Sequence, residues 1–246
     1  MIFHIICGAS SKFFTSILDS LKYSLIDLGY KEGTVSDSDL IIGIKSFHNT
    51  IKKAGKKYWL IQTEYHSSDK IKEVLDFKPD RIFGFNIDSK EEEYLPIGYH
   101  KKLEITNDFP IKGYPICLIG TDTPRRIEFK NKVKNKFEII REWNYVKKIS
   151  LSKNSIINLN LHSYNNNKGF TEWERLATLI SNRCFFISEE MYCPVKGLVY
   201  CNQNNYDQVV EQYLSSTKLR KEVVNSVYYD YVNNFDMRKI LEEKLK

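Results

Sequence analysis

Two arginines follow a glycine-containing turn in the stretch Ile119-Gly120-Thr121-Asp122-Thr123-Pro124-Arg125-Arg126. An apolar run ends at Ile119, Gly120 permits a tight turn, and Thr123-Pro124 can cap and begin a helix. A helix start offers free backbone N–H groups and the positive end of the helix dipole, which suits a diphosphate. Arg125 and Arg126 stand in that first turn, where cations are unfavourable without an anion. The alternative is a solvated pair of surface cations.

A second candidate begins at His162, which ends an apolar strand, and continues through the turn Asn165–Gly169. Gly169 could let the backbone approach a phosphate. Thr171 and Glu174 match the Ser/Thr-x-x-Glu capping box, in which the carboxylate only caps the helix. Alternatively, Glu174 accepts hydrogen bonds from the two ribose hydroxyls of a nucleotide, as acidic side chains do in dinucleotide folds.

A third candidate is Gln62-Thr63-Glu64-Tyr65-His66, directly after an apolar strand. Glu64 or His66 could act as a general base at the carboxyl end of that strand. The alternative is a loop that only caps the next helix. Gly8-Ala9-Ser10-Ser11 follows the first strand but lacks the glycines of a dinucleotide fingerprint.

Composition indicates a globular, soluble chain of 246 residues, because 42% of the residues are hydrophobic and 28% are charged. No apolar stretch approaches the roughly 20 residues that span a bilayer, and the N-terminus reads as a strand rather than a signal peptide. Five cysteines without a CxxC pair favour a reducing, cytoplasmic setting, and no metal site is expected. The net charge of +6 permits an anionic partner or simply a lysine-rich surface.

The elements that must position these side chains alternate between apolar runs and amphipathic segments, the rhythm of βαβ units with parallel sheets. The Pro- and Gly-containing stretch 95–114 reads as a linker. We therefore expect an α/β fold of two Rossmann-like domains, 1–105 and 106–246, with ligands in the cleft outside the strand ends. The expected strands are 2–6, 40–43, 58–61, 81–85, 116–119, 137–140, 155–161, 184–188 and 198–200, and the expected helices are 12–28, a short one after 47, 70–75, 124–134, 172–181, 206–214, 218–232 and 236–245.

The second half resembles the GT-B glycosyltransferases, in particular the family-1-like group that includes CgeB-type proteins. The pieces that carry the likeness cover about residues 95–245. Arg183 stands where the group has a small glycine, Asn166-Asn167 replace an expected first glutamate, and the chain is short for the fold. The similar pieces are Leu95–His100 with "x-P-x-G-x-x", Gly120–Arg126 with "G-x-x-x-x-R-R", Asn158–His162 with "x-L-N-x-H", Glu174–Glu189 with "E-R…S-E/D", and the closing helices 206–245.

The resemblance implies a glycosyltransferase that takes a nucleotide sugar as donor substrate and needs no metal to bind it. No cofactor is expected. It implies that the last helix crosses back to the N-terminal domain. It implies a ribose site at Glu174 and a diphosphate site at Arg125 or Arg126. We also expect His162, Gly169 and Glu189 to contact the donor. The acceptor would be a hydroxyl of a glycan, or of a hydroxylated base in DNA. A non-catalytic nucleotide- or glycan-binding module is the alternative.

Overall fold

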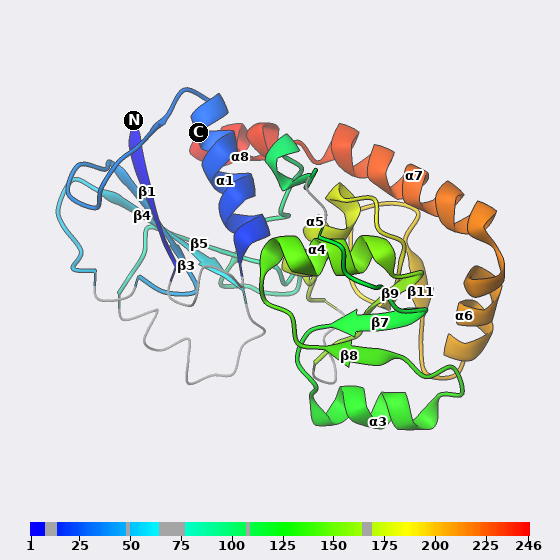
Figure 1. Ribbon diagram of the computed structural model, residues 1–246. Coiled ribbons are helices and arrows are strands. Elements are labelled where there is room, and N and C mark those ends of the chain that lie inside the picture. The colour runs from blue at the N-terminus through cyan, green and yellow to red at the C-terminus, as the bar shows by residue number, and fades with distance from the viewer. Residues whose placement is uncertain (8–13, 48–49, 64–76, 107–108, 164–168) are drawn as a thin grey trace.

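The computed structural model describes residues 1–7, 14–47, 50–63, 77–106, 109–163 and 169–246. Its strands form two separate sheets, in which every pair of neighbouring strands is parallel. Figure 1 shows the two sheets side by side. The expected α/β fold with two Rossmann-like halves is confirmed, whereas the residue at which one domain gives way to the other stays a prediction.

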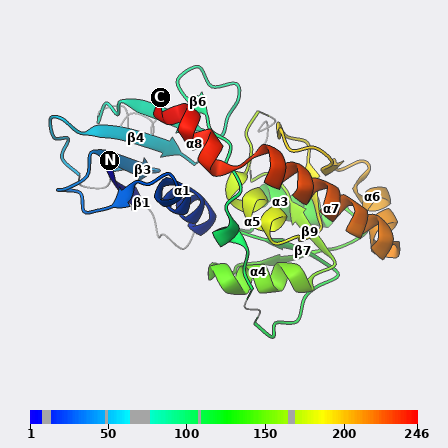
Figure 2. The same cartoon turned by 90° about the horizontal axis from the view of Figure 1, so that it is seen from above.

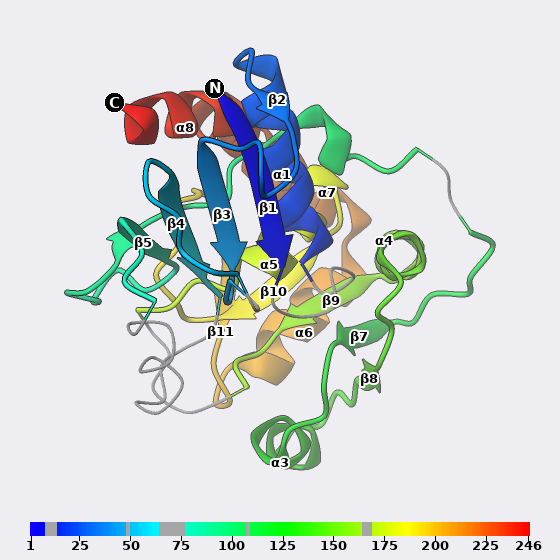
Figure 3. The same cartoon turned by 90° about the vertical axis from the view of Figure 1, so that its left-hand side faces the viewer.

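The N-terminal sheet has six strands in the order β2-β1-β3-β4-β5-β6. Its central strand β3 is apolar and wholly buried, which is typical of a parallel sheet covered on both faces. Figure 3 shows β1, β3 and β4 lying side by side, with helix α1 (Thr15–Asp27) close by. The strands are β1 (Ile2–Cys7), β2 (Lys31–Glu32), β3 (Leu40–Ile44), β4 (Lys57–Gln62), β5 (Arg81–Gly84) and β6 (Glu93–Tyr94).

The C-terminal sheet has five strands in the order β11-β10-β9-β7-β8. The chain leaves β7 toward β8 and leaves β9 toward β10, so the direction of winding changes between β7 and β9. This is the switch point at which parallel α/β sheets bind ligands. The strands are β7 (Ile116–Ile119), β8 (Glu138–Ile140), β9 (Ile157–Asn160), β10 (Phe186–Glu189) and β11 (Val199–Cys201).

The helices of the second half cover different parts of the molecule. Side chains from α3 and α6 join those of the C-terminal sheet in one apolar core. Side chains from α5, α7 and α8 join α1 and the N-terminal sheet in a larger core that spans both halves. The helices are α3 (Pro124–Lys132), α4 (Tyr145–Asn154), α5 (Trp173–Ser181), α6 (Tyr206–Ser215), α7 (Thr217–Asn234) and α8 (Met237–Leu245).

The last helix returns to the N-terminal half, as the resemblance implied. Figures 1 and 2 show α7 running along the C-terminal half and α8 lying against the N-terminal half. The Tyr231 hydroxyl donates to the Ile97 carbonyl over 2.7 Å, and Lys244 Nζ lies 3.2 Å from a Glu93 carboxylate oxygen. A chain segment from the C-terminal half therefore forms part of the N-terminal core.

Three parts of the sequence prediction need correction. The stretch 95–114 is not a bare linker, because Leu95, Ile97 and Leu103 are buried in the larger core and residues Lys101–Leu103 form the short 3₁₀ helix η2. Helix α4 was not expected at all. The short helix expected after residue 47 is wrong for residues 50–56, which contain no helix; only residues 48–49 of that stretch lie outside the described residues. The expected helix 70–75 and the turn Gly8–Ser11 lie outside the described residues.

Candidate active site

A pocket with a cavity volume of about 200 Å³ lies at the switch point of the C-terminal sheet. The carboxyl end of β7 forms one wall, and α4 and α5 form the other. Parallel strands end there and α5 begins close by, so the position fits a phosphate-containing ligand. The described lining consists of Ile119, Gly120, Thr121, Arg126, Trp143, Lys148, Ser152, Asn158, Leu159, Ser163, Glu174, Arg175, Thr178 and Leu179.

Arg126 lies beneath this pocket rather than on the surface, with only 2% of its area exposed. Its guanidinium donates to the carbonyl of Leu161 at 2.6 and 3.0 Å and to the carbonyl of Thr121 at 2.9 Å. Burial lowers its pKa, and the nearby Arg175 lowers it further, to about 10. The charge therefore sits in a place where an anion would stabilise it.

Arg175, in the first turn of α5, approaches the same glycine as Arg126. A Cβ atom placed on Gly120 would come 3.2 Å from Arg175 Nη2 and 3.3 Å from Arg126 Nη1. Both guanidinium groups thus lie against Gly120, at the end of β7. Arg175 also contacts the Asn160 amide oxygen and the Glu172 carboxylate. Two like charges face one point in the pocket, which is the arrangement that binds a diphosphate.

Glu174 also lines the pocket, where its Oε1 lies 2.7 Å from Lys148 Nζ of α4. The capping-box alternative for Glu174 is wrong, because the N-cap of α5 is Glu172 and no side chain caps this helix. The Thr171 hydroxyl instead donates to the Tyr192 carbonyl over 2.5 Å. Glu174 can therefore bind a ligand if its contact with Lys148 breaks.

His162, which is buried, and Glu172, which is partly buried, form a pair behind the arginines. His162 Nδ1 lies 3.7 Å from a Glu172 oxygen, and its Nε2 lies 3.1 Å from the Glu190 carbonyl oxygen. Burial lowers the pKa of His162, but the contacts with Glu172 and the Glu190 carbonyl and the charge of Glu189 together outweigh burial, so the net shift is upward. Burial likewise raises the pKa of Glu172, whereas Arg175, His162 and Arg126 together bring it down to about 2.

Arg125 and Glu189 bind each other. The two guanidinium nitrogens of Arg125 donate to the two Glu189 carboxylate oxygens at 2.5 and 2.7 Å, and Arg125 also donates to the His162 carbonyl. The His162 backbone N–H donates to Glu189 over 2.7 Å. These bonds hold the start of α3 against the ends of β9 and β10. They therefore give Arg125 a structural role that requires no ligand. Its expected role in donor binding, like that of Glu189, stays a prediction.

Gly169 lies at the contact between the two halves. Its carbonyl accepts from the Ile87 N–H over 3.0 Å, and a Cβ atom on it would come 2.1 Å from Asp88 Oδ2. The next residues continue the contact, because the Thr171 N–H donates to the Phe85 carbonyl. Gly169 has no side chain, which allows it to pack closely against the N-terminal half. Its expected contact with a donor phosphate stays a prediction.

The proposed bases Glu64 and His66 lie outside the described residues. The described part of their strand, β4, ends at Gln62, which is buried. Sequence reasoning missed Arg175, Glu172, Lys148 and Trp143 as site residues. Only Arg175 carried a usable signal, since it follows Glu174 in the E-R motif. Lys148 lies on a helix that was not expected, and Trp143 lies just before that helix begins.

Among the residues that the structure describes, no three His, Cys, Asp or Glu side chains gather closely enough to hold a metal ion. Across the same ranges, no helix is both long enough and apolar enough to cross a membrane. The expectations of metal independence and of a cytoplasmic location stay predictions.

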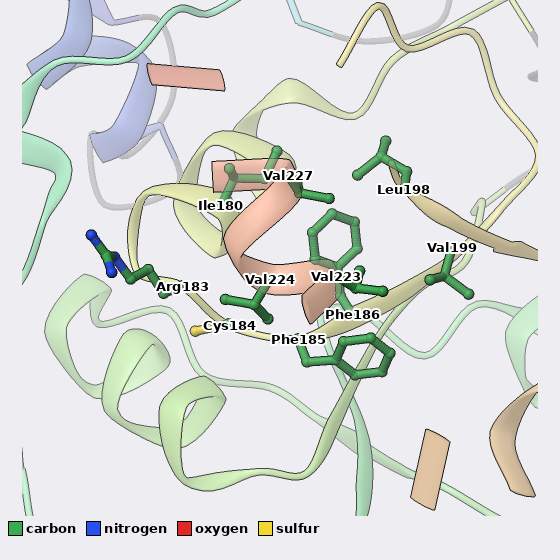
Figure 4. A pocket seen from close by; sticks show the side chains of 10 residues that line it. All are labelled: Ile180, Arg183, Cys184, Phe185, Phe186, Leu198, Val199, Val223, Val224 and Val227. Atoms are coloured by element: carbon green, nitrogen blue, oxygen red, sulfur yellow. The ribbon is translucent and has the colours of Figure 1, made fainter. Parts of the chain in front are cut away.

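A second cavity, of only about 10 Å³, lies between β10, β11 and α7 (Figure 4). Its walls are mostly the apolar side chains of Phe, Val, Leu and Ile, with Arg183 and Cys184 at its edge. Because it is too small for a ligand and has few polar groups to orient one, we interpret it as a packing gap.

No protein-family model matches the sequence, and no curated protein matches it. Solved structures do match its fold. An alpha-glucosyltransferase in complex with UDP-glucose and DNA containing an abasic site has a TM-score of 0.70 and 11% identity, with 99% of this chain and 98% of that chain covered. The T4 phage BGT in complex with its UDP-glucose substrate has a TM-score of 0.56 and 15% identity, with coverage of 98% and 97%.

A third match is an alpha-glucosyltransferase in complex with UDP and a 13-mer DNA containing a HMU base, with a TM-score of 0.68, 12% identity and coverage of 99% and 98%. Likeness at such low identity establishes the fold. The two parallel sheets, the pocket at the switch point and the returning last helix agree with it. The chain therefore has the two-domain fold of the GT-B glycosyltransferases.

Proposed function

We propose that this chain is a glycosyltransferase that moves a sugar from a nucleoside diphosphate donor to a hydroxyl acceptor. The observation that carries the proposal is the convergence of Arg126 and Arg175 on Gly120 at the switch point. Their mutual repulsion, in a buried place, is relieved when a diphosphate binds. The fold shared with solved glucosyltransferases supports the same conclusion.

The pocket offers a separate contact for each part of a nucleoside diphosphate. The two arginines would hold the diphosphate, and Glu174 would exchange Lys148 for the ribose hydroxyls. Trp143, at the rim and 39% exposed, offers an aromatic face to the nucleobase. The CgeB-type assignment rests on the motif pieces of the second half and is part of this proposal.

The chemistry follows from this placement. The acceptor oxygen attacks the anomeric carbon, and the bond from that carbon to the diphosphate oxygen breaks. Arg126 and Arg175 stabilise the negative charge that develops on the leaving diphosphate. In an inverting reaction Glu64 or His66 takes the proton of the acceptor hydroxyl; a product that retains the anomeric configuration would exclude that role.

We propose a hydroxylated base in DNA as the acceptor in preference to a glycan. Two matching structures contain DNA together with UDP or UDP-glucose, and one of these DNAs carries a HMU base. The net charge of +6 agrees with a polyanionic acceptor. A transfer assay with radiolabelled nucleotide sugars should label a hydroxymethylated duplex and leave an unmodified duplex unlabelled.

Donor binding is tested by calorimetry with nucleoside diphosphates. Replacing Arg175→Met or Glu174→Gln removes or neutralises a charge-assisted contact, so affinity should fall about tenfold to a hundredfold. Arg238→Met is the matched control, because Arg238 is paired with Asp236 at the start of α8 and does not line the pocket. Unchanged affinity in both pocket variants rejects the site; binding without transfer or donor hydrolysis favours the non-catalytic module.

A further inference from the structure

Arg183 occupies a backbone position that usually requires glycine. Helix α5 ends in a Schellman motif, in which the Cys184 N–H donates to the Leu179 carbonyl and the Arg183 N–H to the Ile180 carbonyl. Arg183 has a φ of 52°, in the left-handed region that disfavours residues with a Cβ atom. A strained backbone of this kind indicates that the Arg183 side chain has a functional role.

That side chain borders an open groove of about 350 Å³ at the amino ends of β9 and β10. Figure 4 shows Arg183 directed away from the apolar side chains around it. The groove lies at the other end of the sheet from the arginine pair at Gly120, and Ser152 in the last turn of α4 lines both hollows. Its described lining is Ser152, Lys153, Asn154, Ser155, Ile156, Arg183, Cys184, Phe185, Thr217, Arg220, Lys221, Val224 and Asn225.

The described lining contains four cations and no carboxylate. The cations come from three separate segments: the end of α4, the turn before β10, and α7. Arg183 stacks over the Tyr228 ring, 4.0 Å from its centroid. Arg220 donates to the carbonyl of Leu214 at 3.2 Å, and Lys153 to that of Ile105 at 2.6 Å. The carbonyl bond and the ring stacking orient Arg220 and Arg183 without adding a negative charge beside them.

Another basic cluster of the chain provides a contrast. On and after α3, three lysines lie 2.5–3.4 Å from carboxylates: Lys130 with Glu138, Lys132 with Glu128, and Lys134 with Glu211. That surface is largely neutralised, as solvated helix faces usually are. Near the groove, Glu104 contributes to the field at Arg183, but it does not line the hollow and accepts hydrogen bonds from Tyr99 and Tyr228.

We propose that this groove binds the phosphodiester backbone of nucleic acid. Its cations are spread along an open surface, whereas a site for one small phosphate would gather donors around a point. Such binding is independent of sequence and of the donor. It goes beyond the proposed function, because it needs neither the arginine pair nor a hydroxylated base. If DNA is the acceptor, the groove would hold a stretch of the DNA backbone away from the reacting base.

The test measures fluorescence anisotropy of a short, unmodified, fluorescein-labelled DNA duplex in a salt series without donor. Arg183→Gly relieves the strained backbone, so the melting temperature should stay equal or rise. One lost phosphate contact should reduce the slope of log K against log salt by about 0.9, which weakens binding about eightfold near 0.1 M salt. Lys221→Gln, on the α7 wall, should act in the same direction.

Two controls remove the same charge elsewhere. Lys78→Gly relieves a left-handed residue with a φ of 50° in the N-terminal half, and Lys218→Gln changes an exposed α7 residue that lies 4.0 Å from Glu222 and does not line the groove. Both should keep the parent slope. Equal losses in controls and groove variants, or no DNA binding by the parent, overturn the proposal.

Competition by inorganic phosphate at low millimolar concentration, lost in Arg183→Gly, would mean a small-anion site and would also overturn it. Calorimetry with nucleoside diphosphate, run on the same Arg183→Gly protein, should give the parent affinity. If the proposed donor site is wrong, only the calorimetry with nucleoside diphosphate will show it. If the proposed groove is wrong, only the DNA anisotropy measurement will show it.

Discussion

At the scale of single residues, Glu172 organises the cations around the pocket. It contacts Arg175, lies 3.7 Å from His162 Nδ1 and lies 3.9 Å from Arg126. A carboxylate so placed lets two arginines and a histidine share a small buried volume. The sequence did not reveal this role, because the partners come from three separate elements and Glu172 sits beside the more recognisable Glu174.

Glu172→Gln should lower stability in a pH-dependent way. The folded pKa of Glu172, about 2, lies below an unfolded value of about 4.3, so its contribution is present above pH ~4.3 and is lost as pH falls toward 2. The shift corresponds to about 3 kcal/mol at pH 7 and to roughly half of that near pH 3. His162 has a raised pKa, so its own contribution is present below pH ~6.5 and is lost above its folded pKa.

Urea unfolding of parent and Glu172→Gln at pH 7 and pH 3 measures this difference. Glu128→Gln is the control, since Glu128 forms an exposed pair with Lys132, and such pairs contribute little. A stability gap of the same size at both pH values would show that Glu172 acts through packing and not through its charge.

At the scale of elements, apolar strands followed by turn residues were predictable, because burial and backbone geometry act locally there. The strands β1, β3, β7 and β9 and the helices α3, α5 and α7 lie within a few residues of expectation. The short edge strands β2 and β6 were not expected, since each has two residues and no apolar run. Their pairing depends on the neighbouring strand.

Helix α4 was missed because its sequence, YVKKISLSKN, has few strong helix formers and only a weak apolar stripe. Its start is set by Asn144, whose side chain accepts from the Lys147 N–H over 3.0 Å. Missing α4 also hid Lys148 and Trp143 from the predicted site. One member of the arginine pair was predictable. The sequence motif pointed to Arg126 as a diphosphate ligand, whereas only the tertiary structure brings Arg175 close to it.

Asn144→Ala should therefore cost about 1 kcal/mol of stability, the usual value for a lost N-cap. Asn144→Ser retains a capping oxygen and should stay near the parent. Denaturant unfolding of the three proteins measures the difference, with nucleoside diphosphate affinity as a second readout because α4 carries Lys148. If the Ala and Ser variants are equally stable, the cap does not hold α4.

At the scale of the whole molecule, one apolar core joins the two sheets, which share no strand within the described part of the chain. It draws side chains from β1, β3, α1, α5, α7 and α8. Polar contacts follow the same boundary, including the Ser16 hydroxyl, which donates to the Glu174 carbonyl over 3.0 Å, and Trp173 Nε1, which donates to the Tyr94 hydroxyl over 3.1 Å. The pocket at Gly120 therefore lies beside an extensive, largely apolar junction between the halves.

Such a junction should make the halves unfold together. Native-state hydrogen exchange in rising urea should give the central strands β3 and β9 the same opening free energy, because α7 packs against both the shared core and the separate core of the C-terminal sheet and leaves both when the junction opens. Leu241, 1% exposed on α8, belongs to the shared core. Leu241→Ala should lower the opening free energy of both strands equally, by about 2–5 kcal/mol. Lys239→Ala, exposed on the same helix, should leave both unchanged. A fall confined to β3 would mean that α8 stabilises only the N-terminal half, and that the C-terminal half, with the pocket at Gly120, keeps its own stability.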